Sequence, residues 1–152
     1  MIEAVPDGGT TLTLALVMGN NAYIAHVGDS RAYVFNQDAL KQITQDHSLS
    51  QRLEELGQSP EEVKQVQNVL YRAIGQGETV EVDTHMQYLP AGASLLLCSD
   101  GLWGLVEDTD ITDILKTASS PQESCEQLIE KANNNGGLDN ITAIVVSMGA
   151  ES

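Results

Sequence analysis

Basic side chains are scarce in this sequence. Its 152 residues include 7 lysines and arginines against 22 aspartates and glutamates, which gives a formal net charge of −15. Such a chain is repelled by the phosphates of nucleic acids and by anionic membrane surfaces. We therefore expect neither a nucleic acid nor a membrane among its partners. The acidic balance fits a protein that binds divalent cations, although many acidic proteins bind none.

Cysteines and long apolar runs are also few. The two cysteines, Cys98 and Cys125, fall in a predicted strand and a predicted helix, without the spacing of a disulfide framework or a zinc site. No apolar run approaches the length that crosses a bilayer, and we expect no signal peptide. Two isolated thiols of this kind are typical of a reducing compartment and predict a cytoplasmic protein.

Hydrophobic residues alternate with a period of two in much of the chain. This alternation predicts a strand over 10–18, and similar segments predict strands over 22–27, 31–35 and 40–43, joined by short turns as an antiparallel meander. Another half-buried strand is predicted over 80–88. Residues 95–98 are continuously apolar, which is typical of a strand buried on both faces. A last strand is predicted over 141–147.

Helix signals lie in the middle of the chain and toward its end. Helices are predicted over 48–56, 59–67, 110–117 and 120–133. Two of them begin with a serine, a proline and, three residues after the serine, a glutamate, a pattern typical of a capped helix start. Strands at both ends with helices grouped between them predict an α+β fold with antiparallel sheets in a single domain.

Three aspartates stand beside strand ends and close to glycines. Asp29 follows the strand 22–27, Asp100 follows the strand 95–98, and Asp139 precedes the last strand. Each has two interpretations. Aspartate is a common turn-capping residue, but carboxylates on loops at strand ends, without a Cys or His cluster, also suit hard cations such as magnesium or manganese. The three aspartates are therefore candidate metal ligands.

Six stretches of the chain, in this order, carry a resemblance to a known family. They are residues 9–11 (GTT), 25–33 (AHVGDSRAY), 44–48 (TQDHS), 68–75 (NVLYRAIG), 97–103 (LCSDGLW) and 137–142 (GLDNIT). Together they resemble the PPM family, the metal-dependent type 2C protein phosphatases, and the match is nearest to the short bacterial members. The resemblance extends over nearly the whole sequence.

The resemblance implies a fold, a site and a reaction. The fold is an α-β-β-α sandwich, in which two antiparallel sheets pack face to face and are flanked by helices. The site is a binuclear magnesium or manganese centre that hydrolyses phosphoserine and phosphothreonine in phosphorylated proteins. By the motif match, Asp100 and Asp139 correspond to ligands of that centre, and Asp29 to a ligand of a third ion. Residues 46–72 correspond to a flap that helps to choose substrates.

The family pattern begins earlier than this sequence does. An arginine, an acidic pair and an Asp-Gly-x-Gly-Gly stretch, which supplies the bridging aspartate, have no match. The resemblance thus implies that residues 1–152 are the C-terminal portion of a single phosphatase domain, without its N-terminal strands and helix. We expect the chain alone to be inactive and to expose apolar surface at the strands 10–18 and 95–98. The missing segment or self-association would have to cover that surface.

Two other functions fit parts of the sequence. A non-catalytic module of the same fold would bind a metal or a partner without turnover. A calcium-binding structural domain fits less well, because no loop has the ligand spacing of an EF-hand.

The remaining polar side chains are interpreted mainly as structural. The three histidines have no second His or Cys at ligand spacing, although His47 stands beside the expected flap. Trp103 is predicted to anchor the loop that follows Asp100. Arg31 and Arg72 could bind phosphate, but an acidic chain offers each of them a carboxylate partner.

Overall fold

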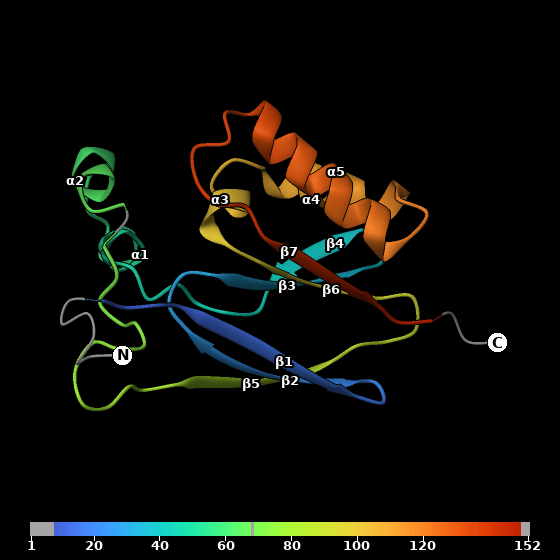
Figure 1. Ribbon diagram of the computed structural model, residues 1–152, viewed down its shortest axis with the longest axis horizontal. Coiled ribbons are helices and arrows are strands. Elements are labelled where there is room, and N and C mark those ends of the chain that lie inside the picture. Colours follow the sequence, from blue (N-terminus) through green and yellow to red (C-terminus); the bar gives the residue numbers. More distant parts are fainter. Residues whose placement is uncertain (1–7, 68, 150–152) are drawn as a thin grey trace.

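Two antiparallel sheets packed face to face form the centre of the molecule (Figure 1). The computed structural model describes residues 8–67 and 69–149. Within these residues, one sheet has the strand order β1-β2-β5, with the bounds Leu12–Met18, Asn21–Val27 and Asp83–Tyr88. The other has the order β4-β3-β6-β7, with the bounds Ala39–Gln42, Arg31–Asn36, Ser94–Cys98 and Ala143–Ser147.

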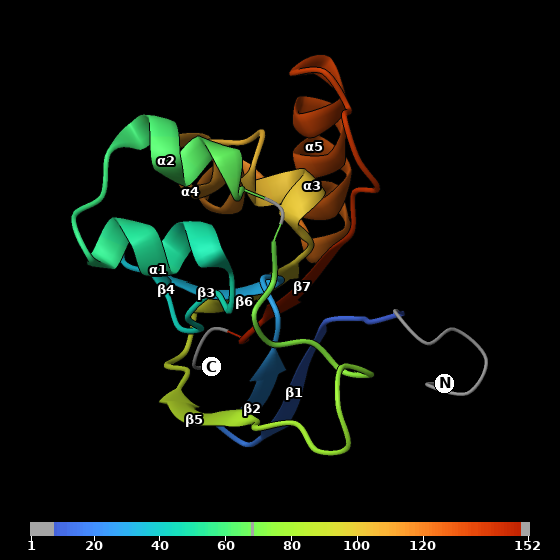
Figure 2. The ribbon, with the colours of Figure 1, turned by 90° about the vertical axis from the view of Figure 1, so that its left-hand side faces the viewer.

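The helices of the described residues form two groups. The first group, on the outer face of the four-stranded sheet, comprises α3 (Asp100–Trp103), α4 (Asp108–Thr117) and α5 (Pro121–Asn134). The second group is a pair at one end of the sandwich, α1 (Leu49–Glu55) and α2 (Pro60–Gln65), which pack on each other (Figure 2). Among the helices described, none is both long enough and apolar enough to cross a membrane.

Two layers of buried side chains hold these elements together. Between the sheets, Ile24, Val34 and Leu95 belong to one apolar cluster. Between the four-stranded sheet and its helices, Leu96 of β6 and Leu128 of α5 belong to another. β6 contributes to both layers because successive side chains of a strand point to opposite faces, and Leu95 and Leu96 are each 0% exposed. The expectation that the strand 95–98 would expose apolar surface is therefore wrong for Leu95, Leu96 and Cys98, whereas Leu97 is half-buried.

The α+β fold with antiparallel sheets is confirmed, but the predicted meander is wrong. β2 lies between β1 and β5 in one sheet, whereas β3 lies between β4 and β6 in the other. The chain thus crosses from one sheet to the other at residues 28–30. Residues 100–103 form a helical turn where a loop was expected. Periodicity identifies a strand but not its neighbours, because pairing is decided by packing between distant segments.

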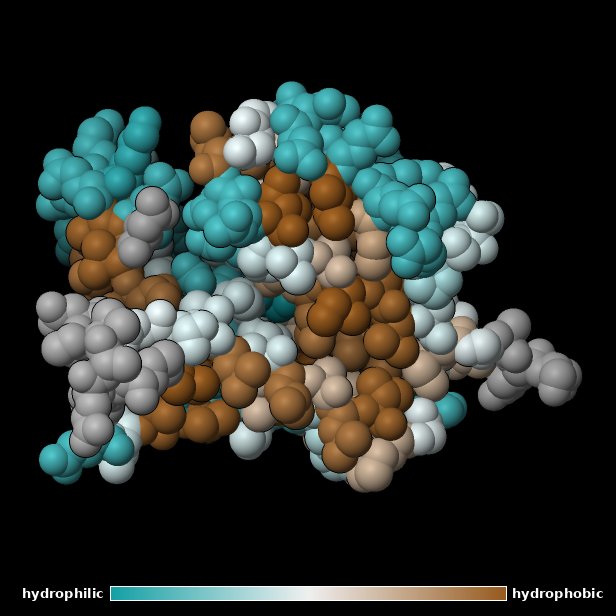
Figure 3. Space-filling model, in the orientation of Figure 1, coloured by the Kyte–Doolittle hydropathy of each residue, from teal (hydrophilic) through white to brown (hydrophobic). Residues whose placement is uncertain are grey.

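Among residues 8–67 and 69–149, no helix covers the outer face of the three-stranded sheet (Figure 1). Large, exposed apolar side chains stand on this surface, which we call the outer apolar face. They are Leu12, Leu14, Leu16 and Met18 of β1, Tyr23 of β2, and Met86 and Tyr88 of β5. Figure 3 shows hydrophobic residues gathered along β1 and over β7. The expectation of exposed apolar surface at residues 10–18 is confirmed.

Candidate metal centre

The three candidate aspartates come from separate segments and line one cavity. Asp29 lies in the crossover between β2 and β3, Asp100 begins α3 directly after β6, and Asp139 lies between α5 and β7. Together with Thr10 and Leu70, they line a cavity of about 490 Å³. A neighbouring cavity of about 260 Å³ is also lined by all three. The structure therefore brings together the residues that the sequence singled out.

Contacts between two backbone segments hold the start of α3 against the loop that precedes β7. The Ser99 hydroxyl donates to the Asn140 carbonyl at 3.1 Å and accepts from the Thr142 amide at 3.0 Å. A Cβ at Gly101 would lie 2.4 Å from the Asn140 carbonyl oxygen. The segments can approach this closely only because Gly101 has no side chain. Asp100 stands at the start of α3 and Asp139 on the loop before β7, so this close approach places both carboxylates at the same cavity.

The turn that carries Asp29 is restrained on both sides. Gly28 has a φ of +113°, and a Cβ there would lie 2.3 Å from Thr11 Cγ2, so a side chain is excluded. On the far side of the turn, Trp103 Nε1 donates to the Asp29 carbonyl at 2.9 Å. Trp103 is therefore a packing anchor, as the sequence predicted: it packs against the apolar cluster between the four-stranded sheet and its helices, and it holds the Asp29 turn.

The Asp29 carboxyl lies among other negative charges. Burial, followed by the neighbouring carboxylates of Asp100 and Asp46, raises the pKa of Asp29 to about 6, and Arg31 offsets part of this rise. A divalent cation beside Asp29 and Asp100 would favour the ionised form of both groups. Acidic oxygen donors in a polar cavity are the ligands that hard cations prefer. The chemistry of the donor set therefore fits magnesium or manganese.

The aspartates by themselves do not complete a coordination shell. Among the residues that the structure describes, no group of three or more Asp, Glu, His or Cys side chains is placed to hold one ion. Asp29 is buried, Asp100 is half-buried and Asp139 is exposed. An ion held by any two of them would need water or other oxygen atoms as its remaining ligands.

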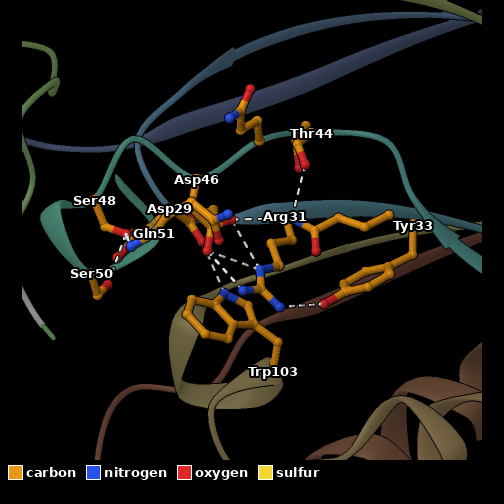
Figure 4. A network of polar contacts seen from close by, with 12 residues as sticks. Asp29, Arg31, Tyr33, Thr44, Asp46, Ser48, Ser50, Gln51 and Trp103 are labelled. Carbon is orange, nitrogen blue, oxygen red and sulfur yellow. Dashed lines mark hydrogen bonds and ion pairs between the residues drawn. The ribbon is translucent and has the colours of Figure 1, made fainter. Parts of the chain in front are cut away.

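Arg31 and Asp46 form a buried ion pair next to the Asp29 turn (Figure 4). Arg31 Nε lies 3.0 Å from Asp46 Oδ1, and Arg31 Nη2 lies 2.8 Å from Asp46 Oδ2. The Arg31 guanidinium also stacks 3.5 Å from the centre of the Trp103 ring, and its Nη1 donates to the Tyr33 hydroxyl at 2.9 Å. All of these contacts are internal. The structural interpretation of Arg31 is confirmed, because its donors are used within the protein.

A second polar network surrounds Arg72. Its Nη1 donates to Asp83 at 2.7 Å, and its Nη2 donates to Glu81 at 3.1 Å. His47 Nε2 lies 3.0 Å from the other oxygen of Asp83. Burial, followed by the nearby His47 ring, lowers the pKa of His26. The structural interpretation of Arg72 and His26 is thus confirmed, since both are held by partners inside the protein, His26 by the Thr13 hydroxyl and the Gln45 carbonyl.

Sequence reasoning missed the acids that hold the two arginines. Asp46 is 3% exposed, and Asp83 begins β5 on the side that faces the other sheet. The alternation in β5 favoured its apolar series as the buried one, yet Met86 and Tyr88 are exposed and the alternate polar series is half-buried. Within the described residues, His85 of that inward series has a buried Nε2 without a hydrogen-bond partner. The polar residues on alternate positions of β5 were the pattern in the sequence that could have indicated a polar inward face.

Comparison with known proteins defines the class. Residues 2–141 match the family described as Protein phosphatase 2C. The serine/threonine phosphatase stp of Listeria welshimeri is 43% identical, over 91% of this chain and 56% of the relative. The structure of the Mycobacterium tuberculosis serine/threonine phosphatase PstP/Ppp superposes with a TM-score of 0.86 at 39% identity, over 97% of this chain and 65% of that one.

A further solved structure, the catalytic domain of PstP in complex with two manganese ions, superposes with a TM-score of 0.82 at 40% identity. It is matched over 95% of this chain and 62% of that one. The antiparallel sandwich is thus that of the metal-dependent phosphatase fold. The chain belongs to the protein phosphatase 2C, or PPM, family. It spans about 56% of the length of the Listeria relative.

Proposed function

We propose that the protein to which this chain belongs hydrolyses phosphoserine and phosphothreonine in phosphorylated proteins. The observation that carries the proposal is the meeting of Asp29, Asp100 and Asp139, from three separate segments, on one cavity. The names of the relatives, serine/threonine phosphatases, support the same reaction. The free thiols of Cys98 and Cys125 support a reducing, cytoplasmic location. The bacterial origin of the serine/threonine phosphatase relatives supports a role in bacterial signalling.

Asp100 and Asp139 are the proposed ligands of a binuclear magnesium or manganese centre, and Asp29 is the proposed ligand of a third ion. The manganese ions of the related PstP structure support this assignment. Such ions polarise a phosphoryl oxygen and lower the pKa of a coordinated water. The contribution of this chain is to hold the carboxylates in place, with Gly28 and Trp103 restraining the turn of Asp29.

Residues 46–72, which include α1 and α2, are the proposed flap. Leu70, near the end of this segment, lines the same cavity as the aspartates, and Gln67 lines the neighbouring one. A segment that reaches the cavity from one side is placed to contact the polypeptide around a phosphorylated residue. This position supports a role in substrate choice.

Residues 1–152 are proposed to be the C-terminal portion of a single phosphatase domain. The outer apolar face supports this proposal, as do β1 and β7, which are edge strands on the same side of the molecule (Figures 1 and 2). Leu12, Leu97 and Ile144 help to line a cavity of about 250 Å³ between those edges. Apolar faces and free edges recruit other segments. The proposed cover is the N-terminal segment of the longer family pattern, or a second copy.

A phosphatase assay on the full-length protein tests the proposed function. Hydrolysis of p-nitrophenyl phosphate and of a phosphothreonine peptide should require manganese or magnesium and should stop when a chelator is added. Asp100→Asn and Asp139→Asn should each lower kcat by roughly a thousandfold or more, because each removes a charged metal ligand. Asp113→Asn makes the same change on an exposed position of α4 and should keep the wild-type rate.

Two results of this assay would contradict the proposal. Near-normal turnover by Asp100→Asn would remove that residue from the ligand set. An absence of metal-dependent turnover in the wild-type protein would instead favour a non-catalytic module of the same fold.

A further inference from the structure

One histidine joins three parts of the molecule beside the proposed site. His47 is 1% exposed. Its side chain contacts Gly28, in the crossover between the sheets, and Asp83 of β5. Its backbone carbonyl accepts from the Tyr71 amide at 3.0 Å, where the two ends of the flap meet. His47 therefore lies where the crossover, β5 and the neck of the flap come together.

His47 binds both polar groups of the Gly28 backbone. The Gly28 amide donates to His47 Nδ1 at 3.0 Å, and the His47 amide donates to the Gly28 carbonyl at 2.7 Å. Gly28 directly precedes Asp29 and has no side chain that could restrain it by packing. Because glycine has the widest conformational freedom of any residue, two hydrogen bonds at this position restrict the direction in which Asp29 leaves the turn.

The same contacts determine which nitrogen of the ring carries the proton. Nδ1 accepts from an amide, so the proton is on Nε2, which donates to Asp83 Oδ2 at 3.0 Å. Arg72 Nη1 is 3.1 Å from Nε2, but two donors do not bond to each other, and its hydrogen bond goes to Asp83 Oδ1 at 2.7 Å. Burial alone would raise the pKa of Asp83, but the contacts with His47 and Arg72 lower it. Asp83 is therefore a carboxylate that orients the ring.

We propose that His47 is a positioning residue for the metal-binding carboxylate of Asp29, and that Asp83 and Arg72 act through His47. This inference rests on the proposed function, because it takes Asp29 as a metal ligand. The imidazole holds the Gly28 peptide so that Asp29 leaves the turn toward the cavity, and the His47 carbonyl ties the same point to the flap. Residues that orient a ligand without touching the ion typically change metal affinity by about 10- to 100-fold.

Two variants separate the side-chain bonds of His47. His47→Asn keeps an oxygen near the position of Nδ1, which can accept from the Gly28 amide, but loses the contact with Asp83. His47→Gln keeps a donor near the position of Nε2 but loses the acceptor for Gly28. Manganese titration of the full-length protein by calorimetry should show affinity for the Asp29 ion falling about 10-fold or more in His47→Gln. His47→Asn should recover most of that loss.

The manganese affinities of the two variants, compared with each other and with the wild type, test the proposal. Equal losses in the two variants, or wild-type affinity in His47→Gln, would overturn the proposal, because a merely structural histidine does not distinguish its two nitrogens in this way. A larger loss in His47→Gln than in His47→Asn supports it.

A second measurement uses the wild-type protein alone. In the 15N-labelled full-length protein, long-range nitrogen–proton spectra should show the ring proton of His47 on Nε2, with Nδ1 as an acceptor, and hydrogen exchange should show a protected Gly28 amide. A proton on Nδ1 or a rapidly exchanging Gly28 amide would overturn the proposal. Neither the titration nor the spectra involve turnover. A protein that binds manganese as described but hydrolyses no phosphoester would therefore refute the proposed function and still test His47.

Discussion

At the scale of single residues, the candidate centre separates carboxylates that line the cavity from side chains that hold them. Asp29, Asp100 and Asp139 line the cavity. Trp103 and His47 hold the backbone on either side of Asp29 through bonds of 2.9 Å and 3.0 Å. Because Trp103 and His47 make these hydrogen bonds inside the protein, they preorganise the site without occupying the cavity.

Asp29→Ala should lower the phosphatase activity of the full-length protein more at low metal concentration than at high. Asp29 is the proposed ligand of the third, more weakly held ion, so a higher concentration restores part of the lost occupancy. A manganese titration of the rate measures this effect, with Asp113→Asn as the control for a lost charge. Equal loss at every concentration would indicate that Asp29 is structural or a ligand of the binuclear pair.

In the metal-free protein, Asp29 should make stability depend on pH. Burial, and then Asp100 and Asp46, raise its pKa from 3.8 to about 6 in the folded state, so the charged form is the unfavourable one. The contribution of Asp29 to the free energy of unfolding is fully present below about pH 4 and is lost as the pH rises through about 6. The loss is at most about 3 kcal/mol. Asp29→Asn removes this titration.

Urea unfolding in the presence of a chelator, at a series of pH values, measures the contribution of Asp29. The free energy of unfolding of Asp29→Asn should rise relative to that of the wild type between about pH 4 and pH 7. A difference that stays constant over this range would contradict the expected pKa.

At the scale of elements, the candidate centre depends on connections rather than on strands. The β2–β3 crossover carries Asp29, the first turn of α3 carries Asp100, and the α5–β7 loop carries Asp139. Each connection joins a strand that pairs with its neighbours in the sheet, β2 with β1 and β5, β6 with β3 and β7, and β7 with β6. Functional side chains on short connections between rigid elements combine accurate placement with access to solvent.

Gly101→Ala should displace the α5–β7 loop from α3. Its Cβ would lie 2.4 Å from the Asn140 carbonyl oxygen and 3.4 Å from Asp139 Cβ, so the loop has to move. We expect a loss of about 1–3 kcal/mol in the free energy of unfolding, with a fall in phosphatase rate in the full-length protein. Urea unfolding and the rate assay measure the two effects. Gly149→Ala, where nothing lies within 4 Å, is the matched control.

At the scale of the whole molecule, strong charge and an exposed apolar face coexist. The net charge of −15 favours solubility and keeps copies apart, whereas the outer apolar face favours association. Its members alternate along β1 and β5, so they form one surface of the three-stranded sheet. A surface of this kind is typical of an interior face whose cover is supplied by another segment.

The 152-residue chain by itself should be inactive and should self-associate, or form a complex with a separately supplied N-terminal segment of the domain. Burial of the outer apolar face is the driving force. Size-exclusion chromatography with light scattering, run beside a phosphatase assay, measures both properties. Mixing the two pieces should restore some metal-dependent hydrolysis.

Substitution of the outer apolar face provides the control for this experiment. Leu14 and Met86 are 50% and 69% exposed, so Leu14→Lys and Met86→Lys should reduce self-association without disturbing the core. A well-folded monomer of the unsubstituted chain that hydrolyses phosphate esters unaided would show that the site is made of other residues.

Local patterns of the sequence determined most of the elements. The alternation in residues 10–18 predicted β1, and the serines, prolines and glutamates at two helix starts predicted α2 and α5. Ser59 and Glu62 do form a reciprocal capping box on α2. These predictions succeed because strand alternation and helix capping depend on residues within a few positions of one another. The three aspartates were found for the same reason, since each stands beside a strand end.

Only the tertiary structure decided which sheet each strand joins and which partner each polar group takes. The crossover at Gly28 sends β2 and β3 to different sheets, and β5 turns Asp83 inward to His47 and Arg72. In a chain with 22 acidic residues, the sequence offers many equivalent partners for each arginine. Contacts between segments far apart in the chain select one of them, because only the folded packing makes a given pair close and buried.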